Sequence, residues 1–319
     1  MKLRKWRVGM VLSKYFKIHR SKIASTYSLV ILLFFNLPLK AQELNSITYS
    51  KFYSIKKEAN YAVDVKQFDE ALNLFNKILP YLSYFKEEDL FRLGKCYIQT
   101  CDTENTLQLL HKLILNGEEM PLIDEWYNID SFYNKIKPMI QFDNYHNRYV
   151  SKLDSSQIKR VDEMLKFDQL LRNYQPEDSQ LNGYKIMVRD KIDSLLFIFL
   201  MNEFLFYGFP SQEKLGDERL RLIAIIMHAS DHAGNWEIMS PILLKSIFEG
   251  TFYPDLYALI ADRHSHVKNR CYQFGHLFYG NFPLCDCKNV DSMRVSIGLD
   301  SLKNHYQRVG LPLPECYLK

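Results

Sequence analysis

Residues 56–82 read KKEANYAVDVKQFDEALNLFNKILPYL, and residues 93–117 read LGKCYIQTCDTENTLQLLHKLILNG. In both stretches apolar or small side chains recur at steps of three and four residues, before and after a short polar break. Such steps place side chains on one face of a helix. Five positions of the first stretch recur 35 residues later, as the pairs Ala59/Gly94, Ala62/Tyr97, Ala71/Thr106, Phe75/Leu110 and Ile78/Leu113. The pattern therefore predicts two pairs of antiparallel helices that pack on each other.

The repeated unit resembles the tetratricopeptide repeat, a helix pair with a period of about 34 residues. The segment QFDEAL at 67–72 is the clearest part of this resemblance. An array of this kind usually needs about three repeats to be stable, so we expect residues 45–118 to pack against the chain that follows. The resemblance implies a surface that docks a protein or peptide, and a helical brace for the second half of the chain is the alternative.

The composition is that of a folded chain, since 47% of its 319 residues are hydrophobic and 24% are charged. Residues 1–41 hold nine Lys or Arg and no acidic residue, and the rest of the chain carries 32 basic against 37 acidic residues. Binding to a nucleic-acid backbone needs a basic surface. This balance therefore excludes a general nucleic-acid-binding protein from the expected classes.

Residues 1–41 have the layout of a secretory signal peptide. A basic stretch at 2–22 precedes an apolar run at 27–39, and Ala41 is the small residue at the expected cleavage site. The apolar run is shorter than the roughly 20 residues that span a bilayer. We therefore expect a periplasmic or secreted protein with no membrane span after signal removal, and an uncleaved anchor is the alternative.

Six cysteines lie at positions 96, 101, 271, 285, 287 and 316. Their spacing does not match zinc-ribbon or redox motifs. We expect structural disulfides or unpaired thiols, and no cofactor. The segment CYQFGHLFYGNFPLCDC at 271–287 contains the pair Gly280–Asn281, which is typical of a hairpin turn.

The rest of the chain after residue 156 again has helical spacing. The predicted fold class is all-α, with a short tetratricopeptide-like array, then a compact helical domain with a small β-hairpin near residues 271–287. The expected divisions are a signal peptide at 1–41, repeats at 45–118, a helical cap or connector at 119–155 and a helical domain at 156–319.

At the start of this second half, two charged residues occupy positions on the apolar face of a predicted helix. Ile158, Val161, Leu165, Asp168 and Arg172 follow one another at steps of three or four residues. Burying a charge without a partner costs several kcal/mol. We therefore expect Asp168 and Arg172 to have partners, and their i, i+4 spacing lets them pair with each other.

The second half carries, in order, DQLLR at 168–172, GFP at 208–210, a lone His at 228, YALIADR at 257–263, YQFG at 272–275 and VDSMRVSIGL at 290–299. This order resembles a family of bacterial helical domains of unknown function, over about half of the chain. In that family the recurring pieces are an Asp-Gln-x-x-Arg helix, a Gly-aromatic-Pro turn, a helix ending in His and an Ala-x-x-x-Asp-Arg helix. The resemblance implies no known activity.

The polar residues of these motifs form the candidate site if the helices turn them inward. The candidates for catalysis are His228 with Asp168 or Asp262, and those for ligand binding are Arg172, Arg263, Gln169 and Gln273. The planar guanidinium of arginine can bind a carboxylate or phosphate through two parallel hydrogen bonds. His228 and His232 are four residues apart, a spacing that can chelate a metal. A buried salt-bridge network that sets the helix register is the alternative.

The sequence thus favours an exported binding or scaffolding protein. We expect it to bind a protein or peptide on residues 45–118. We expect the Asp/Arg/His cluster to be structural or to bind a small anion. A hydrolase-like enzyme that uses His228 with Asp168 or Asp262, with or without a metal, is the alternative function.

Overall fold

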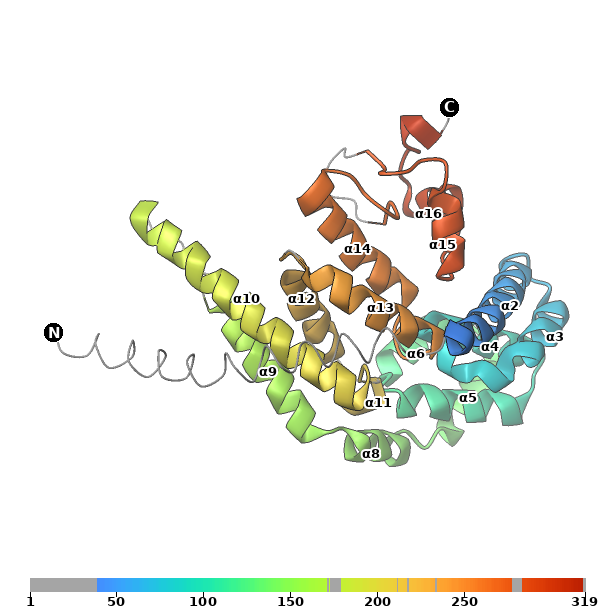
Figure 1. Cartoon of the computed structure of the whole chain (residues 1–319). Coiled ribbons are helices and arrows are strands. Elements are labelled where there is room, and N and C mark those ends of the chain that lie inside the picture. The colour runs from blue at the N-terminus through green and yellow to red at the C-terminus, as the bar shows by residue number, and fades with distance from the viewer. Residues whose placement is uncertain are drawn as a thin grey trace. The chain divides into compact units, whose positions relative to one another are not determined.

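Every regular element that the structure describes is a helix (Figure 1), so the predicted all-α class is confirmed. The computed structural model describes residues 39–317, apart from 171, 173–178, 211, 217, 233 and 277–282. The predicted signal peptide lies outside the described residues up to position 38, and Ala41 lies in the first turn of α2 (Leu39–Asp64). A search of the described helices finds none that is long and apolar enough to cross a membrane. Residues 45–319 form one compact unit.

The repeated stretches form two helix pairs, α2 with α3 (Phe68–Ile78) and α4 (Glu87–Gln99) with α5 (Thr103–Leu115). The short helix η1 (Leu79–Tyr84) connects the pairs. The starts of α3 and α5 lie 35 residues apart, as the repeat predicts. The ten equivalent positions are all buried, namely Ala59, Ala62, Ala71, Phe75, Ile78, Gly94, Tyr97, Thr106, Leu110 and Leu113. The repeated residues therefore make the core between the helices.

Four short elements extend this array: α6 (Met120–Tyr127), α7 (Ser131–Ile136), η2 (Lys137–Met139) and α8 (Phe142–Lys152). The hydroxyl of Tyr127 donates a 2.8 Å hydrogen bond to the carbonyl of Phe91. It also lies over Gly94, where a side chain would collide with it. The missing side chain at Gly94 thus lets α6 approach α4 closely. Because α8 packs on α5, this segment covers the end of the array.

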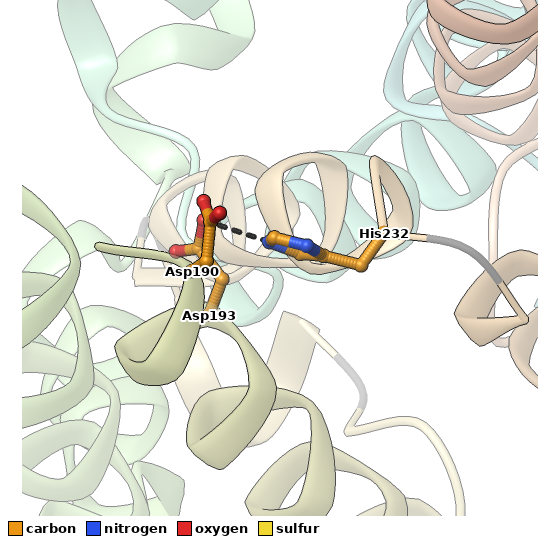
Figure 2. A group of neighbouring side chains, drawn as sticks. All are labelled: Asp190, Asp193 and His232. Atoms are coloured by element: carbon orange, nitrogen blue, oxygen red, sulfur yellow. Dashed lines mark hydrogen bonds and ion pairs between the residues drawn. The ribbon is translucent and has the colours of Figure 1, made fainter. Parts of the chain in front are cut away.

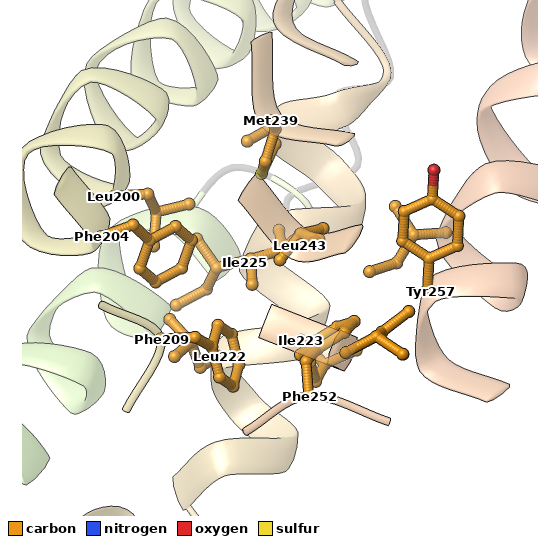
Figure 3. Packing of buried hydrophobic residues seen from close by; sticks show 14 of the residues in the cluster. Leu200, Phe204, Phe209, Leu222, Ile223, Ile225, Met239, Leu243, Phe252 and Tyr257 are labelled. Atoms are coloured by element: carbon orange, nitrogen blue, oxygen red, sulfur yellow. The ribbon is translucent and has the colours of Figure 1, made fainter. Parts of the chain in front are cut away.

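A second core surrounds α12 (Glu218–Ser230). This helix packs against α9 (Ser155–Gln169), α10 (Ser179–Tyr207), α13 (Asn235–Phe248) and α14 (Pro254–Asn269). The short α11 (Gln212–Leu215) leads into it. Figure 3 shows the side chains that meet between these helices, among them Leu200, Phe204, Leu222, Ile225, Met239 and Leu243. Burial of this apolar surface is the main force that holds the five helices together.

The α2 and α4 side of the repeats packs against the second half of the chain. The hydroxyl of Tyr49 donates to the carbonyl of Ile297 at 3.2 Å, and that of Tyr53 donates to Asp300 at 3.0 Å. Lys86 at the start of α4 forms an ion pair with Asp255 of α14. These contacts make that side of the repeats an internal interface.

The C-terminal part of the chain is held by two disulfides, Cys271–Cys285 and Cys287–Cys316. Cys96 is a buried free thiol and Cys101 is an exposed one. The cysteines therefore fall into the expected classes of structural disulfides and unpaired thiols.

The predicted β-hairpin at 271–287 is not confirmed. Its expected turn, Gly280–Asn281, lies outside the described residues, and the described flanks form one isolated bridge between Tyr272 and Leu284. The buried side chain of Arg294 in α15 (Val290–Ser296) organises this region instead. It donates to the carbonyls of Phe274 and Asp300 at 2.6 and 2.7 Å. Helix α16 (Leu302–Val309) and η3 (Glu315–Tyr317) complete the chain.

Gly298 tests the packing between the repeats and the second half. Its φ is +83°, and an added side chain would overlap the hydroxyl of Tyr49. Gly310 has a similar φ of +72° but open space around it. We predict that Gly298→Ala lowers the free energy of unfolding by about 2–4 kcal/mol and Gly310→Ala by only about 1 kcal/mol, in urea denaturation. Equal losses would contradict a close approach of Gly298 to Tyr49.

His276 and His305 make the stability depend on pH. Burial, followed by the positive charges around them, lowers the pKa of His276 to about 3 and that of His305 to about 4. His305 itself, Arg294, Lys86 and Arg308 act on His276, whereas Asp300 partly offsets the effect of the three cations on His305. An unfolded histidine takes up its proton near pH 6.5, whereas these two stay neutral in the folded chain.

The stabilisation is therefore complete above pH 6.5 and declines as the pH falls toward the folded pKa values. We predict a loss of about 1.4 kcal/mol per pH unit for each histidine between pH 6.5 and 5. Denaturation curves at several pH values measure this slope. His305→Gln is expected to reduce it by about half, and an unchanged slope would show that His305 is not responsible.

Candidate functional site

A network of charged and polar side chains joins α9, α10 and α12. Its centre is Asp168, which is only 2% exposed. The Asp168 carboxylate accepts hydrogen bonds from Arg172 at 2.9 and 3.1 Å and from Gln169 at 2.6 Å. Nδ1 of His228 lies 2.9 Å from both of its oxygens. The structure thus brings together four of the predicted site residues, and Asp168 and Arg172 have the partners that their place on the apolar stripe requires.

The network continues through a residue that the sequence motifs did not include. Nη2 of Arg172 donates to Oδ1 of Asp193 on α10 at 2.6 Å. Oδ2 of Asp193 lies 3.1 Å from Nε2 of His232, just after the end of α12. Arg172 therefore connects two carboxylates, and each of these carboxylates holds one histidine.

The charges in this network stabilise one another. Burial alone would raise the pKa of Asp168, but the hydrogen bonds and charges of His228 and Arg172 hold that pKa below its usual value. Burial would lower the pKa of Arg172, and the two aspartates outweigh this and raise it. Both groups are therefore ionised at neutral pH. An anionic ligand of Arg172 would have to compete with two carboxylates that are already in place.

Three other predicted site residues lie outside this network. Arg263 makes a two-pronged ion pair with Asp231, with distances from 2.8 to 3.2 Å. The carboxylate of Asp262, which is fully buried, accepts hydrogen bonds from the backbone N–H groups of Phe274 and His276. Asp262 thus anchors the segment after α14. The carboxylate beside Nδ1 of His228 is that of Asp168 instead. Gln273 lies in that same segment, between the disulfide at Cys271 and Phe274.

Figure 2 shows a group that can hold a metal, formed by Asp190, Asp193 and His232. One donor atom from each residue lies within 4.8 Å of the others. The sequence suggested His228 and His232 as a metal pair. The structure brings His232 to two aspartates of α10 instead, because Nδ1 of His228 faces Asp168.

Asp193 lies on an apolar stripe of α10, as Asp168 does on α9. Asp193, Phe197, Leu200 and Phe204 follow at steps of four, three and four residues, and all four are buried. The charge at the start of this apolar stripe was thus the sequence signal that could have identified Asp193 as a buried, partnered residue. No comparable pattern marks Asp231, whose partner Arg263 lies 32 residues away.

An apolar groove lies beside the network, on the same two helices. It has a volume of about 270 Å³ between α9 and α10, and a second hollow of about 220 Å³ adjoins it. Arg160, Met164 and Phe199 line both, so the two hollows lie next to each other along the same two helices. Phe167 and Leu195 line the first hollow and are 59% and 55% exposed.

Asp168→Asn tests the network. The substitution keeps the shape of the side chain but removes the charge that faces Arg172 and His228. We predict a loss of about 3 kcal/mol in the free energy of unfolding, because breaking a buried ion pair strands its partner. Asp162→Asn on the same helix, where the half-buried carboxylate makes surface ion pairs with Lys166 and Arg221, is the control and lowers the free energy of unfolding by less than about 1 kcal/mol. A similarly small effect for Asp168→Asn would show that the network does not hold the helices.

No protein-family description, curated protein or solved structure matches this chain. The resemblances to tetratricopeptide repeats and to a bacterial family of unknown function therefore stay predictions from the motifs.

Proposed function

We propose that this protein is an exported binding or scaffolding protein, and that its partner inserts one amphipathic helix into the groove between α9 and α10. The observation that carries this proposal is the exposure of large apolar side chains along that groove. Phe167, Leu195 and Phe199 are 59%, 55% and 42% exposed. Grouped apolar surface of this kind is a mark of protein interaction sites.

The shape of the groove favours a helix as the occupant. Its walls are two helices that pack on each other, and the α10 wall runs from Ile192 to Phe204. At 1.5 Å per residue this is roughly 18 Å, or about three helical turns. A helix with apolar residues at i, i+3, i+4 and i+7 fills such a groove.

Charges at the edge of the groove add to its specificity. Arg160 lies 3.7 Å from Glu203 across the two helices, and Glu163 stands one turn further along α9. Both signs of charge are thus present beside the apolar floor. A partner helix with an apolar stripe and one acidic and one basic flank matches this arrangement.

The groove replaces residues 45–118 as the proposed docking surface. The α2 and α4 side of the repeats is occupied by Ile297, Asp300 and Asp255 of the same chain. A partner on that side would have to displace these contacts. In this proposal the repeats brace the second half of the chain, and the polar network keeps the groove walls in register.

Two features support export. The basic stretch and apolar run of residues 1–41 are those of a signal peptide. The two disulfides, Cys271–Cys285 and Cys287–Cys316, are typical of proteins that fold in an oxidising compartment.

The hydrolase alternative keeps one specific observation in its favour. Asp168 holds Nδ1 of His228, as a carboxylate does when it orients a catalytic imidazole. Loss of a measured turnover in His228→Ala, with the fold intact, would favour it over the binding proposal.

The groove is tested by selecting, from a displayed library of random helical peptides, those that bind the purified protein. We predict enrichment of amphipathic sequences whose affinity falls at least tenfold with Phe199→Asp, because a charge is forced into the apolar contact. Leu220→Asp is the matched control, since Leu220 is 67% exposed on α12 and outside the groove. No enrichment, or peptides that bind both variants equally well, would overturn the proposal.

A further inference from the structure

We propose that Asp190, Asp193 and His232 bind one divalent transition-metal ion, with Zn²⁺ the best match. This site goes beyond the proposed docking function and does not depend on it. Figure 2 shows the three side chains turned toward one another, two from α10 and one from the segment after α12.

The positions of the donor atoms suit a metal. Asp190 and Asp193 are three residues apart on α10 and therefore share a face of the helix. Oδ2 of Asp193 and Nε2 of His232 lie 3.1 Å apart. Two ligands of a tetrahedral zinc ion, each about 2.0–2.1 Å from the metal, lie roughly 3.3 Å apart. These two atoms are thus already at nearly the required separation, and Asp190 supplies the third donor within 4.8 Å.

Arg172 acts as a positioning residue for this site. It binds Oδ1 of Asp193 and leaves Oδ2 directed at His232. The side chain of Asp193 is only 4% exposed, so its orientation is set by these two contacts. Metal ligands are commonly oriented by such outer hydrogen bonds, which hold the ligand atom in place before the metal arrives.

The local charge also favours a cation. Three carboxylates, those of Asp168, Asp190 and Asp193, lie around the single guanidinium of Arg172. Arg189 lies 3.5 Å from Asp190, but this is an exposed pair of neighbouring residues. Such pairs are weak and easily displaced. A metal ion would therefore reduce an excess of negative charge next to a buried aspartate.

The donor set selects the class of metal. An imidazole nitrogen with carboxylate oxygens suits Zn²⁺ and related transition metals, whereas Mg²⁺ and Ca²⁺ prefer oxygen ligands alone. Three protein ligands leave at least one coordination position for water or a ligand group. The same arrangement therefore allows binding of a small molecule directly to the metal.

Isothermal titration of the metal-stripped full-length protein with ZnCl₂ tests the proposal, and MgCl₂ is titrated in parallel. We expect one Zn²⁺ per chain and much weaker binding of Mg²⁺. Asp190→Asn, a substitution of a half-exposed side chain, is expected to weaken Zn²⁺ binding at least tenfold, and His232→Gln likewise. Glu203→Gln on the same helix is the control and keeps the wild-type affinity.

Circular dichroism of each variant separates loss of the site from loss of the fold. Absence of stoichiometric Zn²⁺ binding, or equal affinity in wild type and Asp190→Asn, would overturn the proposal. The Phe199→Asp variant is expected to bind Zn²⁺ normally, so failure of the docking proposal and failure of the metal proposal are distinguishable.

Discussion

Arg172 joins Asp168 of α9 to Asp193 of α10, and both surfaces proposed for this protein depend on that connection. A buried ion pair adds little net stability, because the cost of removing charges from water offsets their attraction. Its effect is geometric. The two helices that it connects are the walls of the apolar groove, and the second carboxylate that it holds is the central ligand of the proposed metal site.

The repeats and the second core depend on each other for a similar reason. Two short helix pairs bury only part of their apolar surface, and an array of two units needs further packing. Segments around residues 255 and 297–300 supply it through Tyr49, Tyr53 and Lys86. The chain thus uses for its own stability a side of the array that would otherwise be open to a partner.

Much of the helical pattern was readable from spacing alone. The 35-residue repeat identified ten positions that are all buried, because helical periodicity and burial follow directly from the order of residues. Asp168 and Arg172 were recognisable for the same reason, since a charge on an apolar stripe needs a partner. Asp193 obeys the same rule on α10. It became visible only when the register of α9 against α10 showed which residue faces Arg172.

Residue order alone predicts the helical class, the repeat, the charged stripe on α9 and the basic and apolar segment at the N-terminus, because each depends on residues close together in the chain. Tertiary structure alone decided the partners: Asp193 rather than Asp262 in the network, Asp231 for Arg263, and two aspartates rather than His228 beside His232. These choices depend on how distant helices cross and slide against one another, and periodicity within one helix carries no information about that.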